Sequence, residues 1–251
     1  MTAPNRAAPP RQENPSRTDV PPAADVLSGE RRLLVVLAHP DDEAFGCTGV
    51  MAILRRRGVP VTYVCATMGQ MGRLMGRPPF ATRESLPVLR RRELAEAMRI
   101  AGVDDVRLLG LWDKTVEFED PDALAQRIAA IIDDVRPSTL ITFHPEHSGH
   151  PDHHAVGRAT LAALDRSTVV PRPRVWMPAI RSDEVKLDLP IETVDISAVS
   201  QLKRAAFAAH RSQTTGWDER LAANEEMRTR FEWIFREERF WVWAPAGTGG
   251  S

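Results

Sequence analysis

The 251-residue sequence is poor in several features that define large classes of proteins. Its two cysteines, Cys47 and Cys65, cannot form a disulfide network, which favours a reducing compartment such as the cytoplasm. No apolar run reaches the roughly 18 residues of a membrane span, so we expect a soluble chain with no membrane partner. Basic side chains (33) and acidic side chains (34) nearly cancel, which argues against a nucleic-acid partner held by a broad basic surface.

Histidine is also scarce, but it is unevenly distributed. The chain has only seven histidines, and five of them fall within the eleven residues from 144 to 154. Hydrophobic residues make up 43% of the chain, which is an ordinary share for a globular domain and indicates no particular function. The histidine cluster is therefore the feature of the composition that points to function.

The two ends of the chain differ from its middle. Residues 1–30 hold six of the 20 prolines and few apolar side chains, and such a segment cannot offset the entropy lost on ordering. We predict a disordered proline-rich arm over 1–30, a single domain over 31–246 and a flexible tail over 247–251.

Between these ends, short apolar runs alternate with segments of helical periodicity. Strands are predicted at 33–38, 61–67, 106–111 and 139–143, and helices at 43–58, 86–101, 121–135 and 153–164. This alternation predicts an α/β fold in which a mostly parallel sheet is covered by helices on both faces.

The C-terminal third is less regular. Further strands are expected at 175–180 and 191–195, and helices at 197–210 and 221–236. Six of the 15 aromatic residues lie in residues 231–243, where a packed core or a subunit contact is favoured over ligand stacking. Self-association of the chain is consistent with this segment.

Two polar segments each follow a predicted buried strand. The first reads Ala-His-Pro-Asp-Asp-Glu over residues 38–43, and the second reads His-Pro-Asp-His-His over residues 150–154. Ligand sites in open α/β sheets gather at the carboxyl ends of strands, so we expect both segments to face one crevice. Imidazoles and carboxylates together form a ligand set that zinc accepts, and the pairing therefore predicts a metal site.

The adjacent carboxylates Asp41 and Asp42 fit such a site. Neighbouring residues in a turn point in different directions, so one can bind the metal while the other faces the metal-bound water. Zinc lowers the pKa of that water to about 7, and a nearby carboxylate can take its proton. Taken alone, acidic residues at this point also suit the start of a helix, where they complement the helix dipole.

The two motifs together resemble the zinc-dependent N-acetylglucosamine deacetylases of the PIG-L/LmbE superfamily over about residues 31–215. The resemblance implies a Rossmann-like three-layer sandwich. It also implies that zinc is bound by His39, Asp42 and His153, and that Asp41 is the general base. Iron(II) suits the same ligands.

The remaining residues of the second motif are given more limited roles by the same resemblance. His150 would stabilise the tetrahedral oxyanion, and Asp152 would orient His150 and tune its charge. No role is predicted for His144, His147 or His154.

A narrower resemblance, to the second type of bacillithiol-biosynthesis deacetylase, rests on the segments between the motifs. These segments are residues 68–73, 78–81, 83–87 and 113–118. That family removes acetate from N-acetylglucosaminyl malate, and Arg73, Arg77 and Arg83 are candidates to bind a malate-like carboxylate. For each arginine, a solvated loop charge is the alternative. Met68 and Gln70 stand where many superfamily members have arginine and glutamate.

The predicted function is therefore metal-dependent N-deacetylation of a small amino sugar conjugate. Two alternatives stay open. The chain can be an amidase or deacetylase for another thiol-linked or antibiotic-linked amino sugar, or it can be a catalytically inactive module that binds a sugar.

Overall fold

The computed structural model describes residues 25–180 and 185–243, and it contains the predicted alternation of strands and helices. The strands are β1 (Leu33–Leu37), β2 (Val61–Thr67), β3 (Asp105–Leu111), β4 (Thr139–Ile141), β5 (Arg174–Pro178), β6 (Ile191–Asp195) and β7 (Glu237–Trp243). The helices are α1 (Asp42–Gly46), α2 (Thr48–Arg56), α3 (Leu86–Ala101), α4 (Pro121–Val135), α5 (Pro151–Arg166), α6 (Ser200–Ala209), α7 (Arg211–Thr214), α8 (Trp217–Ala223) and α9 (Glu225–Trp233).

The strands of the described residues form one seven-stranded sheet in the order β3-β2-β1-β4-β5-β7-β6. The pairs from β3 to β5 are parallel, while β7 runs antiparallel to both β5 and β6. Every residue of β1 is buried, as expected of a central strand covered on both faces. The prediction of a mostly parallel sheet is confirmed.

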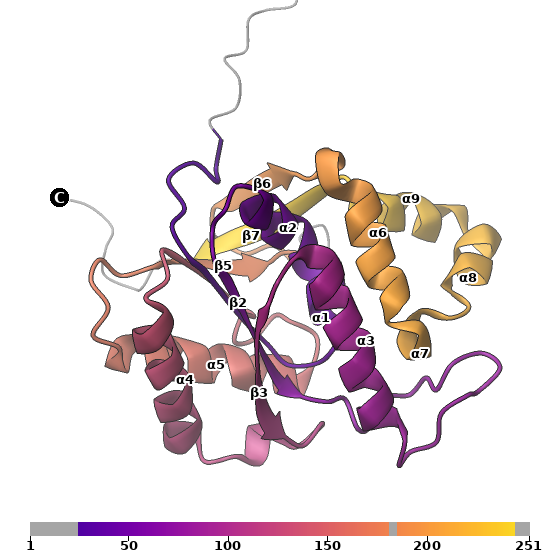
Figure 1. Cartoon of the computed structure of the whole chain (residues 1–251), viewed down its shortest axis with the longest axis horizontal. Helices are drawn as coiled ribbons and strands as arrows, with labels where there is room; N and C mark the ends of the chain where they lie inside the picture. Colours follow the sequence, from indigo (N-terminus) through magenta and orange to yellow (C-terminus); the bar gives the residue numbers. More distant parts are fainter. Residues whose placement is uncertain (1–24, 181–184, 244–251) are drawn as a thin grey trace, which may run out of the picture.

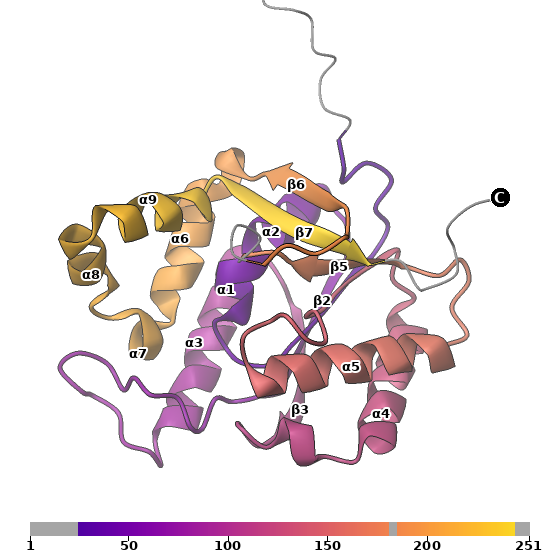
Figure 2. The same ribbon diagram turned by 180° about the vertical axis from the view of Figure 1, so that it is seen from behind.

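Helices cover both faces of this sheet (Figures 1 and 2). Helices α4 and α5 pack against each other on one face, and α2, α3 and α6 pack together on the other. Asp120 caps α4, since its carboxylate accepts the backbone N–H groups of Asp122 and Ala123 at 2.9 and 3.2 Å. The three-layer α/β architecture is confirmed.

The helix predicted over 43–58 is instead two helices. Cys47, with φ −155° and ψ 8°, separates α1 from α2. The start of α2 is stabilised from far along the chain, because the Glu238 carboxylate accepts the N–H groups of Gly49 and Val50 at 2.7 and 2.8 Å. The prediction of a single helix was wrong, because the stabilising contact comes from a residue about 190 positions away and cannot be read from the local sequence.

The sequence reasoning also missed β7. Residues 221–236 were expected to be one helix, whereas α8, α9 and a turn occupy this region and lead into the strand. The aromatic residues here pack inside the chain: Phe240 stacks on Trp176 with ring centroids 4.7 Å apart, and Trp241 is buried. The packed-core interpretation of this segment is confirmed.

Of the predicted arm, residues 1–24 lie outside the described residues, as does the predicted tail over 247–251. Residues 25–30 contact the domain: Leu27 is buried in the core, and the Glu30 carboxylate accepts hydrogen bonds from Ser138 and Thr139. Glu30 also pairs with Arg174.

Candidate metal-dependent active site

The polar segments meet at the carboxyl edge of the sheet, as predicted. His39 to Asp42 follow β1 and lead into α1, while His150 to His153 form the start of α5 after β4. Two further loops reach the same edge, with Gly69 following β2 and Asp113 following β3. The structure therefore brings together residues that are more than 100 positions apart in the sequence.

His39 lies at the centre of this group and is buried. Its Nε2 is 3.0 Å from Asp152 Oδ2 and 3.2 Å from Asp113 Oδ1. Since ionised carboxylates only accept hydrogen bonds, the network assigns the proton of the neutral ring to Nε2 and the lone pair to Nδ1. That Nδ1 is 3.2 Å from His153 Nε2.

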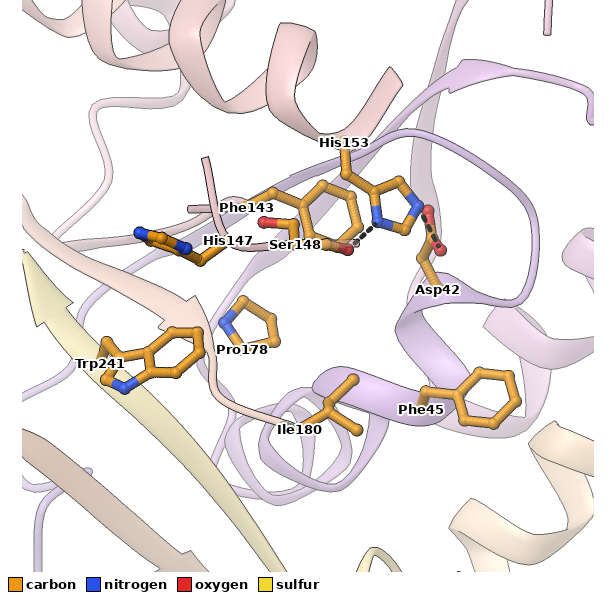
Figure 3. A pocket seen from close by; sticks show the side chains of 9 residues that line it. All are labelled: Asp42, Phe45, Phe143, His147, Ser148, His153, Pro178, Ile180 and Trp241. Carbon is orange, nitrogen blue, oxygen red and sulfur yellow. Dashed lines mark hydrogen bonds and ion pairs between the residues drawn. The ribbon is translucent and has the colours of Figure 1, made fainter. Parts of the chain in front are cut away.

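His153 is oriented in the same way. Its Nδ1 is 3.1 Å from the carbonyl oxygen of Ser148, which can only accept, so the lone pair of the neutral ring is at Nε2. Nε2 in turn lies 3.2 Å from Asp42 Oδ1. Figure 3 shows the ring stacked on Phe143, at a centroid distance of 3.9 Å, with Asp42 at its edge.

With both rings neutral, metal-binding atoms thus converge from His39, Asp42 and His153. Burial acts to lower the pKa of His39, but its hydrogen bonds with Asp113, Asp152 and Asp42 raise it well above its usual value, so metal binding there displaces a proton. His39 Nδ1 is 3.2 Å from His153 Nε2, His153 Nε2 is 3.2 Å from Asp42 Oδ1, and His39 Nδ1 is 3.5 Å from Asp42 Oδ2, so the two oxygens of Asp42 face different rings. Tetrahedral zinc with bonds of about 2.0–2.1 Å separates its ligand atoms by about 3.4 Å, so these residues fit the ion. Other metal-capable groupings share His39: one adds His150 and His153, the other adds Asp113, His150 and Asp152.

Asp41 lies beside this cluster in an unusual backbone conformation, with φ at 107°. Its backbone N–H donates to Glu43 Oε2 at 3.1 Å, and its carboxylate lies 3.1 Å from the Arg90 guanidinium. Burial raises the pKa of Asp41 to about 6, although the charge of Arg90 acts in the opposite direction. The side chain retains 20% exposure and can therefore reach solvent or a ligand.

His150 caps α5 through its ring, because Nδ1 accepts the backbone N–H of Asp152 at 3.1 Å. This bond assigns the proton to Nε2 in the neutral ring. Burial and the neighbouring His39 and His153 lower the pKa of His150 and favour that neutral form. His150 is thus a hydrogen-bond donor at this edge of the sheet.

The contacts of Asp152 differ from the expected ones. Its carboxylate holds His39 and accepts the N–H groups of Lys114 and Val116 at 2.7 and 3.2 Å. Among the described residues, its side chain forms no hydrogen bond to His150, which it orients through its backbone N–H alone.

Two of the three remaining histidines of the cluster, His144 and His154, hold the loop before α5 through their rings. His144 Nδ1 accepts the N–H groups of Glu146 and His147, and His154 Nε2 accepts that of Ser148. These bonds position Ser148, whose carbonyl orients the ring of His153.

The three candidate arginines lie on or beside the loop between β2 and α3, in different settings. Arg73 is exposed. Arg77 pairs with Glu219 at 3.0 Å, both side chains being largely exposed. Arg83 donates to the carbonyl oxygens of Gln70 and Gly72 at 3.0 and 2.8 Å, so its guanidinium holds the loop backbone.

Sequence reasoning did not assign a role to Asp113 or Arg90. Asp113 had a signal, since it follows a predicted strand at the same edge of the sheet. Arg90 also had a sequence signal. It is a charged residue at the helical spacing of Leu86, Leu94 and Ala97 on the buried face of α3, where charged side chains are rare unless they are paired.

A cavity of about 200 Å³ adjoins the cluster on the side of Asp42 and His153. Most of its walls are apolar and come from α1, the segment between β4 and α5, the end of β5 and strand β7, as Figure 3 shows. The apolar lining residues are Phe45, Phe143, Pro178, Ile180 and Trp241. An apolar group with one polar end toward the cluster fits this space.

The fold and site define an α/β protein with a His/Asp cluster able to hold a metal at the carboxyl edge of its sheet. The model of the GlcNAc-PI de-N-acetylase (PIG-L) family matches residues 34–164, and the chain belongs to this family. The matched segment includes both polar motifs and Arg90.

Individual relatives extend the likeness over most of the chain. The probable N-acetyl-alpha-D-glucosaminyl L-malate deacetylase 2 of Bacillus subtilis is 45% identical over 219 residues, covering 85% of this chain and 98% of that protein. Among solved structures, an N,N'-diacetylchitobiose deacetylase from Pyrococcus horikoshii superposes with a TM-score of 0.65 at 22% identity, covering 88% of this chain and 86% of that one. The 4-carboxy-2-hydroxymuconate hydratase GalB from Pseudomonas putida superposes with a TM-score of 0.68 at 20% identity, covering 88% of this chain and 99% of that one. At these identities, the two structures support the fold alone.

Within the described residues, every helix is too short or too polar to span a membrane.

Proposed function

We propose that the protein is a cytoplasmic, zinc-dependent deacetylase that hydrolyses the N-acetyl group of N-acetylglucosaminyl malate in bacillithiol biosynthesis. The observation that carries this proposal is the convergence of the ring nitrogens of His39 and His153 with the carboxylate of Asp42, next in sequence to Asp41, whose carboxylate is partly exposed. The first three residues would hold the metal, with iron(II) as the alternative ion. A bound zinc ion supplies a Lewis acid and a water molecule of lowered pKa.

The chain's own residues divide proton transfer and oxyanion stabilisation between them. Asp41, as general base, takes the proton of the attacking water. The Nε2–H of His150 donates a hydrogen bond to the oxygen of the acetyl carbonyl as negative charge develops there. The departing amine receives the proton that Asp41 took from the water, which returns Asp41 to its carboxylate form. Asp152 and the Ser148 carbonyl keep the rings of His39 and His153 in the orientation required for metal binding.

The substrate assignment rests on the B. subtilis relative, which shares 45% of its residues with this chain across nearly its whole length. The sugar and malate would lie toward the loop between β2 and α3, where Arg73 and Arg77 are exposed enough to meet a carboxylate and Arg83 keeps the loop in place. The acetyl methyl would enter the apolar cavity beside His153.

Two variants test the mechanism. We expect Asp41→Asn to retain one zinc per chain and to lose about 10²–10⁴-fold in kcat, since general base catalysis contributes this much. His39→Ala should lose zinc and activity together. Acetate release and metal analysis of the purified proteins measure both effects. Full activity of Asp41→Asn would contradict the role of Asp41, and zinc retention by His39→Ala would contradict the ligand set.

The substrate is tested by comparing kcat/KM for N-acetylglucosaminyl malate with kcat/KM for the inositol-linked analogue. We expect the malate conjugate to be preferred, and Arg73→Ala to raise KM for the malate conjugate alone. Preference for the inositol conjugate would overturn the substrate assignment while leaving the reaction intact. Zinc-bound protein that binds these sugars without releasing acetate would instead support a sugar-binding module.

A further inference from the structure

We propose that Arg90 is a positioning residue for the reaction, which orients the Asp41 carboxylate and ties it to the loop after β2. This inference rests on the proposed function, because it assigns Arg90 a role through the proposed base. Arg90 belongs to α3, which lies on one face of the sheet and away from the two motifs in sequence (Figure 1).

The guanidinium of Arg90 contacts three groups from two loops. Its Nη2 lies 3.1 Å from Asp41 Oδ2 and also donates to the carbonyl oxygen of Pro40. Its Nη1 donates to the carbonyl oxygen of Gly69 at 3.1 Å. One planar group thus bridges the first motif and the start of the loop that carries the candidate substrate arginines.

The position is buried, which makes these contacts specific. Arg90 is only 3% exposed, and Asp41 is the acidic residue that forms an ion pair with it among the described residues. A buried guanidinium requires a counter-charge and carbonyl acceptors, and these three contacts supply one counter-charge and two acceptors for Nη1 and Nη2. The buried Nε has no hydrogen-bond partner among the described residues. In return, the carboxylate of Asp41 has a fixed partner on one oxygen, which limits its rotation.

The backbone of Asp41 needs such support. Its φ of 107° is unfavourable for a residue with a side chain. Two contacts hold the conformation from either side: Glu43 accepts the Asp41 N–H, and Arg90 binds the preceding carbonyl of Pro40. Strain of this kind persists only where surrounding contacts determine it, and here the strained residue is the proposed base.

The lack of a side chain at Gly69 gives the Arg90 guanidinium the space that it occupies. A Cβ atom on Gly69 would lie 1.7 Å from Arg90 Nη1, so any side chain at residue 69 would displace the guanidinium. The φ of Gly69 is also positive, at +59°. A substitution at this residue therefore perturbs Arg90 without changing either member of the ion pair.

The principal test compares kcat, KM, zinc content and thermal unfolding of Arg90→Met, Arg90→Lys and Asp41→Asn. We expect Arg90→Met to bind one zinc and to lose about 10²-fold in kcat, the scale associated with misplacing a reacting group, with KM changed less than about threefold. Arg90→Lys should recover part of the loss, because an ammonium can pair with Asp41 but cannot bridge three acceptors. Arg92→Ala, an exposed arginine on the same helix, is the matched control and should behave as the wild type.

A second route avoids the loss of the buried arginine, should Arg90→Met not fold. Gly69→Ala should lower kcat in the same way with zinc retained. Gly58→Ala, which introduces a side chain at a similar φ of +78° into open space, should leave kcat unchanged and affect stability alone.

The outcomes separate this inference from the proposed function. Full activity of Asp41→Asn would overturn the base assignment, whatever Arg90 does. An inactive Asp41→Asn together with Arg90→Met or Gly69→Ala at wild-type kcat would overturn the role of Arg90 alone. Loss of zinc, or a change confined to KM, would also contradict it, since either result assigns Arg90 to the metal site or to substrate binding.

Discussion

At the scale of single residues, the site depends on which atom of each histidine carries a proton. Asp152 contributes to this choice at His39, and it does so from a fully buried position where two backbone N–H groups also donate to its carboxylate. A carboxylate can accept all three hydrogen bonds, because it has no hydrogen of its own. Asp152 therefore fixes the tautomer of His39 that leaves Nδ1 free for a metal.

We expect Asp152→Asn to weaken zinc binding by about 10–100-fold, the usual effect of changing a partner of a metal ligand. The NH₂ of the amide replaces either Oδ2, which accepts from His39 and Lys114, or Oδ1, which accepts from Val116, so at least one buried donor is left unsatisfied. Titration with a competing chelator measures the affinity. Asp104→Asn, at an exposed aspartate, is the control and should bind zinc as the wild type does. Equal affinity for the Asp152 variant would show that the carboxylate does not act through His39.

At the scale of elements, the helix that carries His153 and Asp152 must approach the chain after β4 closely. Gly157 of α5 allows this approach: a Cβ there would lie 2.4 Å from the carbonyl oxygen of Phe143. The obstacle is backbone, so relief requires α5 or the strand end to move. The residues at the start of α5 would move with it.

Gly157→Ala should therefore destabilise the protein by about 1–3 kcal/mol, the usual cost of overpacking. The sign is informative, because alanine is otherwise favoured over glycine inside a helix by about 0.5–1 kcal/mol. Urea denaturation monitored by circular dichroism measures the change. Ala162→Gly, at a half-buried position of the same helix, reports the propensity effect together with the loss of one methyl group that packs against the core. A stabilised Gly157→Ala variant would show that the approach to Phe143 is relaxed in solution.

The elements also show what sequence alone can predict. Apolar runs such as 33–38 identify the parallel strands, because burial on both faces leaves a local signature. The break at Cys47 and strand β7 have no such local signature. Glu238 stabilises the helix start after Cys47, and β7 is stabilised by pairing with β5 and β6. In the site, the motifs predict which residues meet, but the partners of Asp152 and Arg90 lie on segments 21 to 113 positions away.

At the scale of the whole molecule, one buried ion pair joins segments from the two ends of the domain. Lys203 of α6 is fully buried, and its ammonium lies 2.7 Å from Glu238 of β7 and 3.1 Å from the carbonyl oxygen of Phe45. Glu238 in turn caps α2 through Gly49 and Val50. This pair connects α1 and α2, which follow the first motif, with the antiparallel edge of the sheet.

Removing one member of this pair should destabilise the entire domain. We expect Lys203→Met to lower the free energy of unfolding by about 3–5 kcal/mol, because it leaves the Glu238 carboxylate buried without a counter-charge. Lys203→Met combined with Glu238→Gln should be more stable than Lys203→Met alone, since the amide carries no charge and can still accept one of the α2 N–H groups. Urea unfolding of both single variants and the double variant completes the cycle. A cost below about 1 kcal/mol for Lys203→Met, or strict additivity in the cycle, would show that the pair does not couple these elements.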